Sequence, residues 1–428
     1  MALESLEFKE EDSDAGAFRR RLAFAFGMVI LCFSLLVMRL AWLQIIKQDT
    51  YQQRAEQNRT VTTTNQGSRG LIFDRNGTLI AGNRLSWSIE ITLDQTVEPI
   101  NRLIDRLAEV IKITPADRRR FRRLREDLNR YDGIPIRTDL TDAEVAAFTA
   151  QRWRFPGVDI NQREHRIYPE HALGSHIIGY VSSLSLNDKK RLDSEGVLAL
   201  YQGHETLEIT ADGRSVRTLE LIPAHPGKNL RLSVDMNLLS VAENAMKGKT
   251  GAIIAIEPRT GEILSFVSLP TYDLNLFPGG IDPESWSYLN TAETKPLLNR
   301  AMRGIYPIGS TYKPFMALAG LETGAVTADF IHYYWLSTQI GVDGIYNFMK
   351  QWKFGAKTGI DLVGEQTGIL PNREWKERRI KEPWYVGDTP SLGIGQGYNA
   401  FTLLQLAHAT ATLANRGVIM TPHLVKSI

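Results

Sequence analysis

The chain has 428 residues, of which 43% are hydrophobic and 23% charged, and its formal net charge is +2. At about 150 residues per domain this length predicts two or three domains, each able to bury a core. The composition excludes a disordered tail, a collagen-like repeat and a disulfide-rich miniprotein. The balanced charge argues against a dedicated nucleic-acid-binding protein. The single cysteine, Cys32, excludes an intramolecular disulfide.

An apolar segment near the N-terminus predicts a membrane anchor. Residues 22–46 are long enough to cross a hydrocarbon core of about 30 Å, and residues 22–38 hold no charged side chain. Three arginines precede the segment, so the positive-inside rule keeps residues 1–21 in the cytoplasm and exports the rest. A cleaved signal peptide and a buried core helix are the alternatives. The length and the lack of a small-residue cleavage site favour a single-pass anchor.

The next part of the chain mixes helical and strand-like patterns. Residues 48–59 continue as a predicted helix, residues 74–77 have the composition of a tight hairpin turn, and residues 86–92 alternate like a half-buried strand. Residues 101–150 are expected to be helical. Within them, residues 117–125 are rich in arginine, and we favour a solvated helix face over a surface that binds anions.

A change in composition at residues 223–227 marks a linker. A strand over 229–234 and a helix over 236–246 are expected after it. Residues 251–268 then read as a β-hairpin, with Gly261 at the left-handed bulge position after a type I turn. Helical patterns dominate the sequence that follows. Strands followed by many helices predict an α+β fold with an antiparallel sheet packed against helices.

One motif could carry chemistry, the tetrapeptide from Ser310 to Lys313. A helical pattern follows it, so Ser310 is predicted at a helix N-terminus with Lys313 on the same face one turn later. A lysine shielded from water has a lowered pKa and can take the proton of a serine hydroxyl, while helix-end N–H groups stabilise negative charge. Taken alone, the motif is weak, because a serine cap beside a surface lysine has the same pattern.

The surrounding motifs favour the catalytic interpretation of Ser310 and Lys313, because their order resembles that of class B penicillin-binding proteins. The resemblance is greatest to the elongation-type, cell-shape members. The resemblance covers nearly the whole chain. It rests on the following segments: Arg69-Gly70, Asp74–Gly77, Arg166–Pro169, His176–Val181, Gly251–Phe277, Leu298–Ala301, Tyr306–Pro314, Thr358–Leu362 and Gly393–Tyr398.

The resemblance implies a peptidoglycan D,D-transpeptidase that cross-links stem peptides during cell elongation and is inhibited by β-lactams. Ser310 would be the acyl-ester nucleophile and Lys313 its general base. No cofactor is implied. The expected partners are peptidoglycan stem peptides, β-lactams, a membrane glycan polymerase of the elongation machinery and associated scaffold proteins, with no nucleic acid. The chain would be a single-pass protein of the bacterial inner membrane with its bulk in the periplasm.

The implied domains are a cytoplasmic tail (1–21), a transmembrane anchor (22–46), a non-catalytic pedestal (47–225) and a transpeptidase domain (226–428). The last is expected to lack an internal loop and its C-terminal part, because two family motifs have no clear counterpart. The Ser-x-Asn or Ser-x-Asp motif is matched only by Ser337-Thr-Gln339, which has the wrong third residue. The Lys-Ser/Thr-Gly motif has two misplaced matches, at 249–251 and 357–359.

A second class of function stays open, a membrane-anchored scaffold that activates a glycan polymerase while its acyl site is dispensable. A β-lactam sensor is disfavoured, because a sensor needs a cytoplasmic output module and the predicted tail has about twenty residues. The glycine-rich run at 393–397 lacks the spacing of a nucleotide-binding loop and is expected to form a tight turn before a helix over 401–415.

Overall fold

The computed structural model describes residues 4–48, 59–127, 133–182, 190–192, 194, 202–209, 215–329 and 332–428. Internal contacts divide the chain into two compact units. The first comprises Met1–Gln66 and Gln202–Ala224, and the second comprises Gly67–Tyr201 and His225–Ile428.

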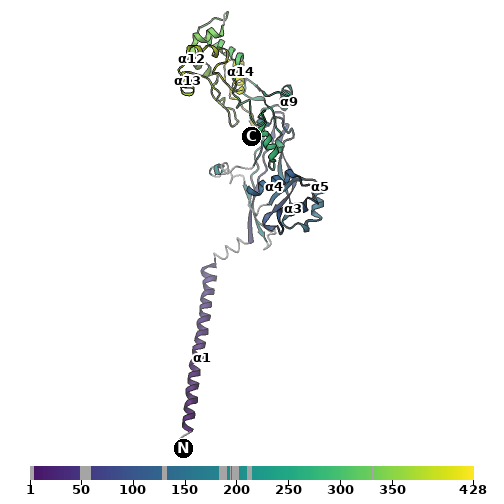
Figure 1. Cartoon of the computed structure of the whole chain (residues 1–428), viewed down its shortest axis with the longest axis vertical. Coiled ribbons are helices and arrows are strands. Elements are labelled where there is room, and N and C mark those ends of the chain that lie inside the picture. The colour runs from purple at the N-terminus through teal and green to yellow at the C-terminus, as the bar shows by residue number, and fades with distance from the viewer. Residues whose placement is uncertain are drawn as a thin grey trace. The chain divides into compact units, whose positions relative to one another are not determined.

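The first unit holds a long helix and a small sheet. Helix α1 (Glu4–Ala41) continues into a π-helical turn (Trp42–Ile46), and its span Phe18–Ile45 is long and apolar enough to cross a membrane (Figure 1). None of that span is buried by protein, which distinguishes it from a core helix and confirms the predicted apolar helix. Strands β1 (Thr60–Gln66), β6 (Gln202–Ile209) and β7 (Ser215–Ile222) form an antiparallel sheet in the order β1-β6-β7. Most of the predicted helix over 48–59 lies outside the described residues.

The second unit begins with a sheet centred on β3 (Leu79–Thr92), which pairs antiparallel with β2 (Ile72–Phe73), β4 (Gly133–Leu140) and β5 (Val158–Ile167). The predicted tight turn between β2 and β3 is confirmed. Its buried Asp74 accepts hydrogen bonds from the amides of Asn76 and Thr78, and Gly77 has a φ of +91°.

Helices α3 (Ile100–Leu107), α4 (Pro115–Asp127) and α5 (Asp142–Thr149) lie in the region that the sequence predicted to be wholly helical. That prediction is wrong for β4, because Ile134 and Ile136 are buried on alternate positions and pack into the core of this sheet. The arginine-rich run lies on α4, where Phe121 faces the core and Arg118 pairs with Asp105 at 2.6 Å. This arrangement fits the solvated helix face.

The predicted elements after the linker are present. Strand β8 (Leu230–Leu232) and the last strand, β11 (Val425–Ser427), join the sheet centred on β3, whose order is β11-β8-β2-β3-β4. Helix α9 (Met236–Ala245) follows, and then the hairpin of β9 (Gly251–Ile256) and β10 (Ile263–Leu269), with Gly261 at a φ of +83°. The remaining helices are α6 (Ser175–Ile178), α10 (Pro283–Thr291), α11 (Lys313–Glu322), α12 (Tyr333–Gln351), α13 (Arg373–Ile380) and α14 (Leu403–Ala414).

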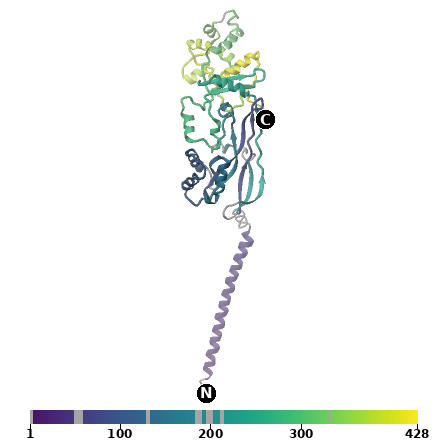
Figure 2. The same ribbon diagram turned by 90° about the vertical axis from the view of Figure 1, so that its right-hand side faces the viewer.

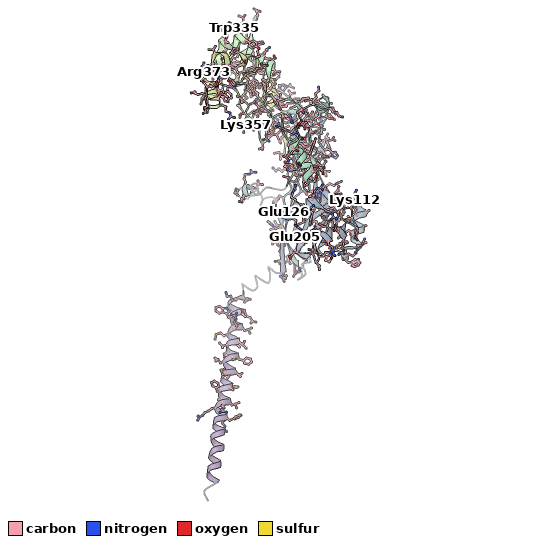
Figure 3. All side chains as sticks on the ribbon, viewed as in Figure 1. Lys112, Glu126, Glu205, Trp335, Lys357 and Arg373 are labelled. Carbon is pink, nitrogen blue, oxygen red and sulfur yellow. The ribbon has the colours of Figure 1, made fainter. Side chains whose placement is uncertain are left out.

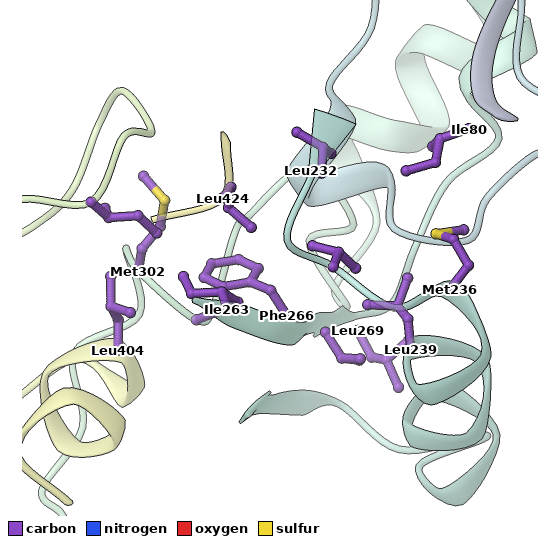
Figure 4. Packing of buried hydrophobic residues seen from close by; sticks show 14 residues of the cluster. Ile80, Leu232, Met236, Leu239, Ile263, Phe266, Leu269, Met302, Leu404 and Leu424 are labelled. Carbon is purple, nitrogen blue, oxygen red and sulfur yellow. The ribbon is translucent and has the colours of Figure 1, made fainter. Parts of the chain in front are cut away.

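Two hydrophobic cores support this second half of the unit. One gathers side chains of β10 with Leu404 of α14 and Leu424, and Phe266 is fully buried within it (Figure 4). The other gathers α11, α12 and α14, which lie together in the green-to-yellow part of the ribbon (Figure 2). The mixed α+β fold with an antiparallel hairpin is therefore as predicted.

Shortening Phe266 to alanine tests the first core. The side chain is 0% exposed, so Phe266→Ala should lower the free energy of unfolding by about 3–5 kcal/mol. Chemical denaturation followed by tryptophan fluorescence measures the change. Leu85→Ala is the control, because Leu85 is 62% exposed and its loss should cost no more than about 0.5 kcal/mol. Equal effects of the two changes would contradict the assigned core.

Candidate active site

Ser310 lies in the 3-10 turn η5 (Gly309–Tyr312), which leads directly into α11. We call residues 309–312 the Ser310 turn. The predicted helix N-terminus is confirmed, with Pro314 in its first turn and Gly324 just past its end at a φ of +70°. Buried positions follow helical spacing and comprise Tyr312, Phe315, Met316 and Ala319. Since these face the core, Ser310 is left exposed and Lys313 partly buried.

The buried side chain of Tyr312 anchors the Ser310 turn to the hydrophobic core. It is completely buried, its ring lies 5.4 Å from that of Phe354 and 5.8 Å from that of Phe401, and burial raises the pKa of its hydroxyl. Among the described residues its hydroxyl has no hydrogen-bond partner. The ring packing, rather than a polar contact of the phenol, therefore holds the turn in place.

Lys313 meets a residue that the sequence did not single out. Its Nζ lies 5.2 Å from the centre of the Tyr333 ring, at the start of α12. An ammonium over an aromatic face is attracted by the ring quadrupole, which restrains the long lysine side chain. No spacing rule connects positions twenty residues apart on two helices, so only the fold reveals this contact.

The glycine-rich turn (residues 393–397) packs against the Ser310 turn. Gly309 donates its N–H to the carbonyl of Gly395 at 3.0 Å. A Cβ on Gly395 would lie 2.3 Å from the Gly309 oxygen and 2.7 Å from Tyr312 Cβ, and its φ is +69°. Glycine is therefore needed at position 395 for both backbone conformation and close approach. The predicted tight turn is confirmed, and α14 follows it with a capping box between Thr402 and Gln405.

The candidate for the second motif lies in the body of a helix. Ser337 is 0% exposed within α12, and its Oγ donates to the carbonyls of Tyr334 at 2.8 Å and Pro390 at 3.4 Å. Its hydroxyl thus ties α12 to the segment before the glycine-rich turn. Helix α12 bends at Gly341 and contacts α13 through Arg373, which donates to Asp343 at 2.9 Å. Figure 3 labels Arg373 and Trp335, the latter in the first turn of α12.

The two matches to the third motif lie in structural positions. Residues 249–251 lead into β9. In the other match Lys357 is exposed (Figure 3), whereas Thr358 is buried and donates both its N–H and its hydroxyl to Glu365, each at 2.7 Å. Nearby Asp361 accepts the N–H groups of residues 424 and 425 at 2.8 Å. These carboxylates stabilise loops, and among the described residues no hydrogen bond links either match to Ser310.

Family comparisons match most of the chain. Residues 64–197 match the penicillin-binding protein dimerisation domain. Residues 251–332 and 329–428 match the penicillin binding protein transpeptidase domain.

Curated relatives match over nearly the full chain. The peptidoglycan D,D-transpeptidase MrdA of Escherichia coli (strain K12) is 33% identical over 481 residues, which cover 98% of this chain and 76% of that protein. MrdA of Acinetobacter baumannii is 34% identical over 476 residues, covering 98% of this chain and 71% of its own length.

Solved structures share the fold. A complex between Penicillin-Binding Protein (PBP2) and MreC from Helicobacter pylori matches with a TM-score of 0.72 and 26% identity, covering 86% of this chain and 79% of that one. Pseudomonas aeruginosa PBP2 in complex with WCK 5153 matches with a TM-score of 0.59 and 29% identity, covering 86% and 73%.

Adding a methyl group at Gly395 tests the contact between the two turns. Gly395→Ala forces a positive φ on alanine and a clash with Gly309, so the free energy of unfolding should fall by about 2–4 kcal/mol. Thermal or urea unfolding measures it. Gly387→Ala is the matched control, since nothing lies within 4 Å of a Cβ there. A Gly395 variant as stable as the control would contradict this contact.

Proposed function

This chain belongs to the penicillin-binding proteins as an MrdA-like peptidoglycan D,D-transpeptidase, and from that premise we propose that Ser310 is the residue acylated in its reaction. The observation that carries the proposal is which side chains at η5 are buried and which are exposed. Tyr312 is locked in the core, which leaves the Ser310 hydroxyl exposed and Lys313 one helical turn away. A nucleophile and a base on one rigid helix end need little reorganisation to react.

The proposed reaction proceeds through a serine ester. Lys313, in its neutral form, takes the proton of the Ser310 hydroxyl while Oγ attacks the carbonyl of the penultimate D-Ala of a stem peptide. The tetrahedral intermediate collapses, its C–N bond breaks, and the proton passes to the leaving terminal D-Ala. An amine on a neighbouring stem then attacks the ester carbonyl, the C–Oγ bond breaks, and a proton of the amine returns to Ser310 Oγ through Lys313, which completes the cross-link. A β-lactam would be opened by the same attack and remain on Ser310.

Backbone donors at the helix end support the oxyanion. The N–H groups of the first turn of a helix have no intrahelical acceptor and point toward its N-terminal end. Gly309 already donates to Gly395, so the N–H of Ser310 is the donor that we assign to the developing negative charge. The hydrogen bond at Gly309 would hold that donor in place.

We place the protein in the bacterial inner membrane, with residues 22–46 as a single-pass anchor, residues 1–21 in the cytoplasm and the bulk of the chain in the periplasm. The apolar span Phe18–Ile45 supports this, as does the similarity to MrdA. A membrane glycan polymerase and scaffold proteins of the elongation machinery are the proposed partners. Support comes from a similar PBP2 solved with MreC and from a similar chain, at a TM-score of 0.65, in a peptidoglycan synthase complex.

The division into tail, anchor, pedestal and transpeptidase domain stays a prediction. One observation favours the scaffold as a second candidate function. Ser337, the nearest match to the second motif, is buried and bonded within α12. If the acyl site were dispensable, the chain would act through its pedestal on a polymerase alone.

Replacing Ser310 separates the two functions. Ser310→Ala should abolish covalent labelling by a fluorescent penicillin, because alanine has no oxygen with which to form the ester. Gel fluorescence of the full chain in detergent measures labelling. Thr311→Ala is the control, since Thr311 is an exposed neighbour whose hydroxyl donates to Ile308, and it should label normally. Equal labelling of wild type and Ser310→Ala would reject Ser310, and an unlabelled wild type that still activates the polymerase would favour the scaffold.

Exchanging Lys313 for arginine tests the base. Arginine keeps the positive charge but does not release its proton in proteins, so Lys313→Arg should slow acylation by about 10²–10⁴-fold. Stopped-flow or quenched labelling gives the rate constant. A rate within threefold of wild type would remove Lys313 from the proposed mechanism.

A further inference from the structure

Helix α13 contains a buried charge that the proposed reaction does not use. The side chain of Lys376 is 1% exposed, although six of the eight residues of α13 are charged. Its Nζ donates to Asp388 at 2.7 Å and lies 4.5 Å and 5.6 Å from the ring centres of Tyr385 and Tyr398. A second carboxylate, that of the more exposed Glu382, lies 3.7 Å from the same Nζ. Burial alone would lower the pKa of this lysine, but the hydrogen bond and charge of Asp388 outweigh it and raise that pKa.

Asp388, the partner of Lys376, also stabilises a backbone turn over residues 385–388. The same Oδ2 of Asp388 accepts the N–H of Tyr385 at 2.8 Å, and the N–H of Asp388 donates to the carbonyl of Tyr385 at 3.1 Å. Burial raises the pKa of Asp388, but the hydrogen bonds from Lys376 and from the Tyr385 N–H, together with the charge of Lys376, outweigh burial and lower that pKa. Because the pKa of Lys376 is raised and the pKa of Asp388 is lowered, both groups stay ionised at every pH between these two pKa values.

From this turn, hydrogen bonds joined by short stretches of backbone lead to the Ser310 turn. Trp384 donates its indole N–H to Thr389 at 3.0 Å, and the Thr389 carbonyl accepts from Leu392 at 3.0 Å. The Leu392 carbonyl accepts from Gly395, again at 3.0 Å, and the Gly395 carbonyl holds Gly309. Each link is a backbone or fixed side-chain contact, so a shift at Asp388 has few ways to be absorbed before residue 395.

We propose that Lys376 is a positioning residue for the reaction at Ser310, because its pair with Asp388 fixes residues 385–397 and thereby the Ser310 turn. The inference rests on the proposed function of Ser310. A buried ion pair contributes little net stability compared with apolar side chains of similar size, since desolvation offsets the attraction. The pair instead restricts the conformation of the turn at residues 385–388. The ammonium lies near two tyrosine rings and is hydrogen-bonded to Asp388, whose Oδ2 also accepts the N–H of Tyr385, so few conformations of the turn keep all of these contacts.

Lys376→Met tests this role, because methionine fills similar volume without the charge. In the full chain, hydrogen exchange of peptides spanning 306–312 should become about tenfold faster. The rate constant of acylation by penicillin should fall by about 10–100-fold, while the dissociation constant of the noncovalent complex stays within threefold. Arg378→Met is the matched control, an exposed cation on the same helix that pairs only with Glu374 within the described residues. It should behave as wild type in both measurements.

A second variant covers the case in which Lys376→Met does not fold. Asp388→Asn keeps the shape and one acceptor oxygen but removes the charge, and it should show the same two changes more weakly. Unchanged exchange at 306–312 with an unchanged acylation rate constant, in either folded variant, would overturn the proposal. If the wild type is not acylated, the proposed function fails, and the exchange measurement alone still decides whether Lys376 holds the turn.

Discussion

One backbone contact governs the site, the hydrogen bond from Gly309 to the carbonyl of Gly395. It joins the turn that presents Ser310 to a segment more than eighty residues later in the chain. The approach is so close that a side chain at position 395 would collide with the backbone of Gly309. Tyr312 packs against the rings of Phe354 and Phe401 in the core. The Ser310 turn is therefore held by this core packing as well as by the hydrogen bond to Gly395. The exposed hydroxyl is then the part of the turn left to react.

This construction explains how a weak sequence motif becomes a site. A serine three residues before a lysine occurs often by chance, and its geometry is useful only if the helix end is fixed. Here the apolar residues of α11 face one core, α12 places Tyr333 over Lys313, and the glycine-rich turn closes the remaining side. Three segments far apart in the sequence thus determine the positions of two side chains.

The local parts of this arrangement were predictable from sequence because their causes are local. The hairpin at 251–268, the turn at 74–77 and the start of α11 each follow from residues a few positions apart. Strand β4 was missed because charged helices flank it, and only pairing with β3 reveals its alternation. Tyr333 and Lys376 were also missed. Lys376 is one charge among six in α13, and its burial depends on Asp388 and two tyrosines brought there by the fold.

The most direct test of this account is a crystal structure of the full chain after reaction with a β-lactam. The account predicts continuous density from Ser310 Oγ to the carbonyl carbon of the opened ring, with the Gly309 amide still bonded to Gly395. An adduct on another residue, or no adduct in a crystal whose Ser310 is accessible, would contradict it.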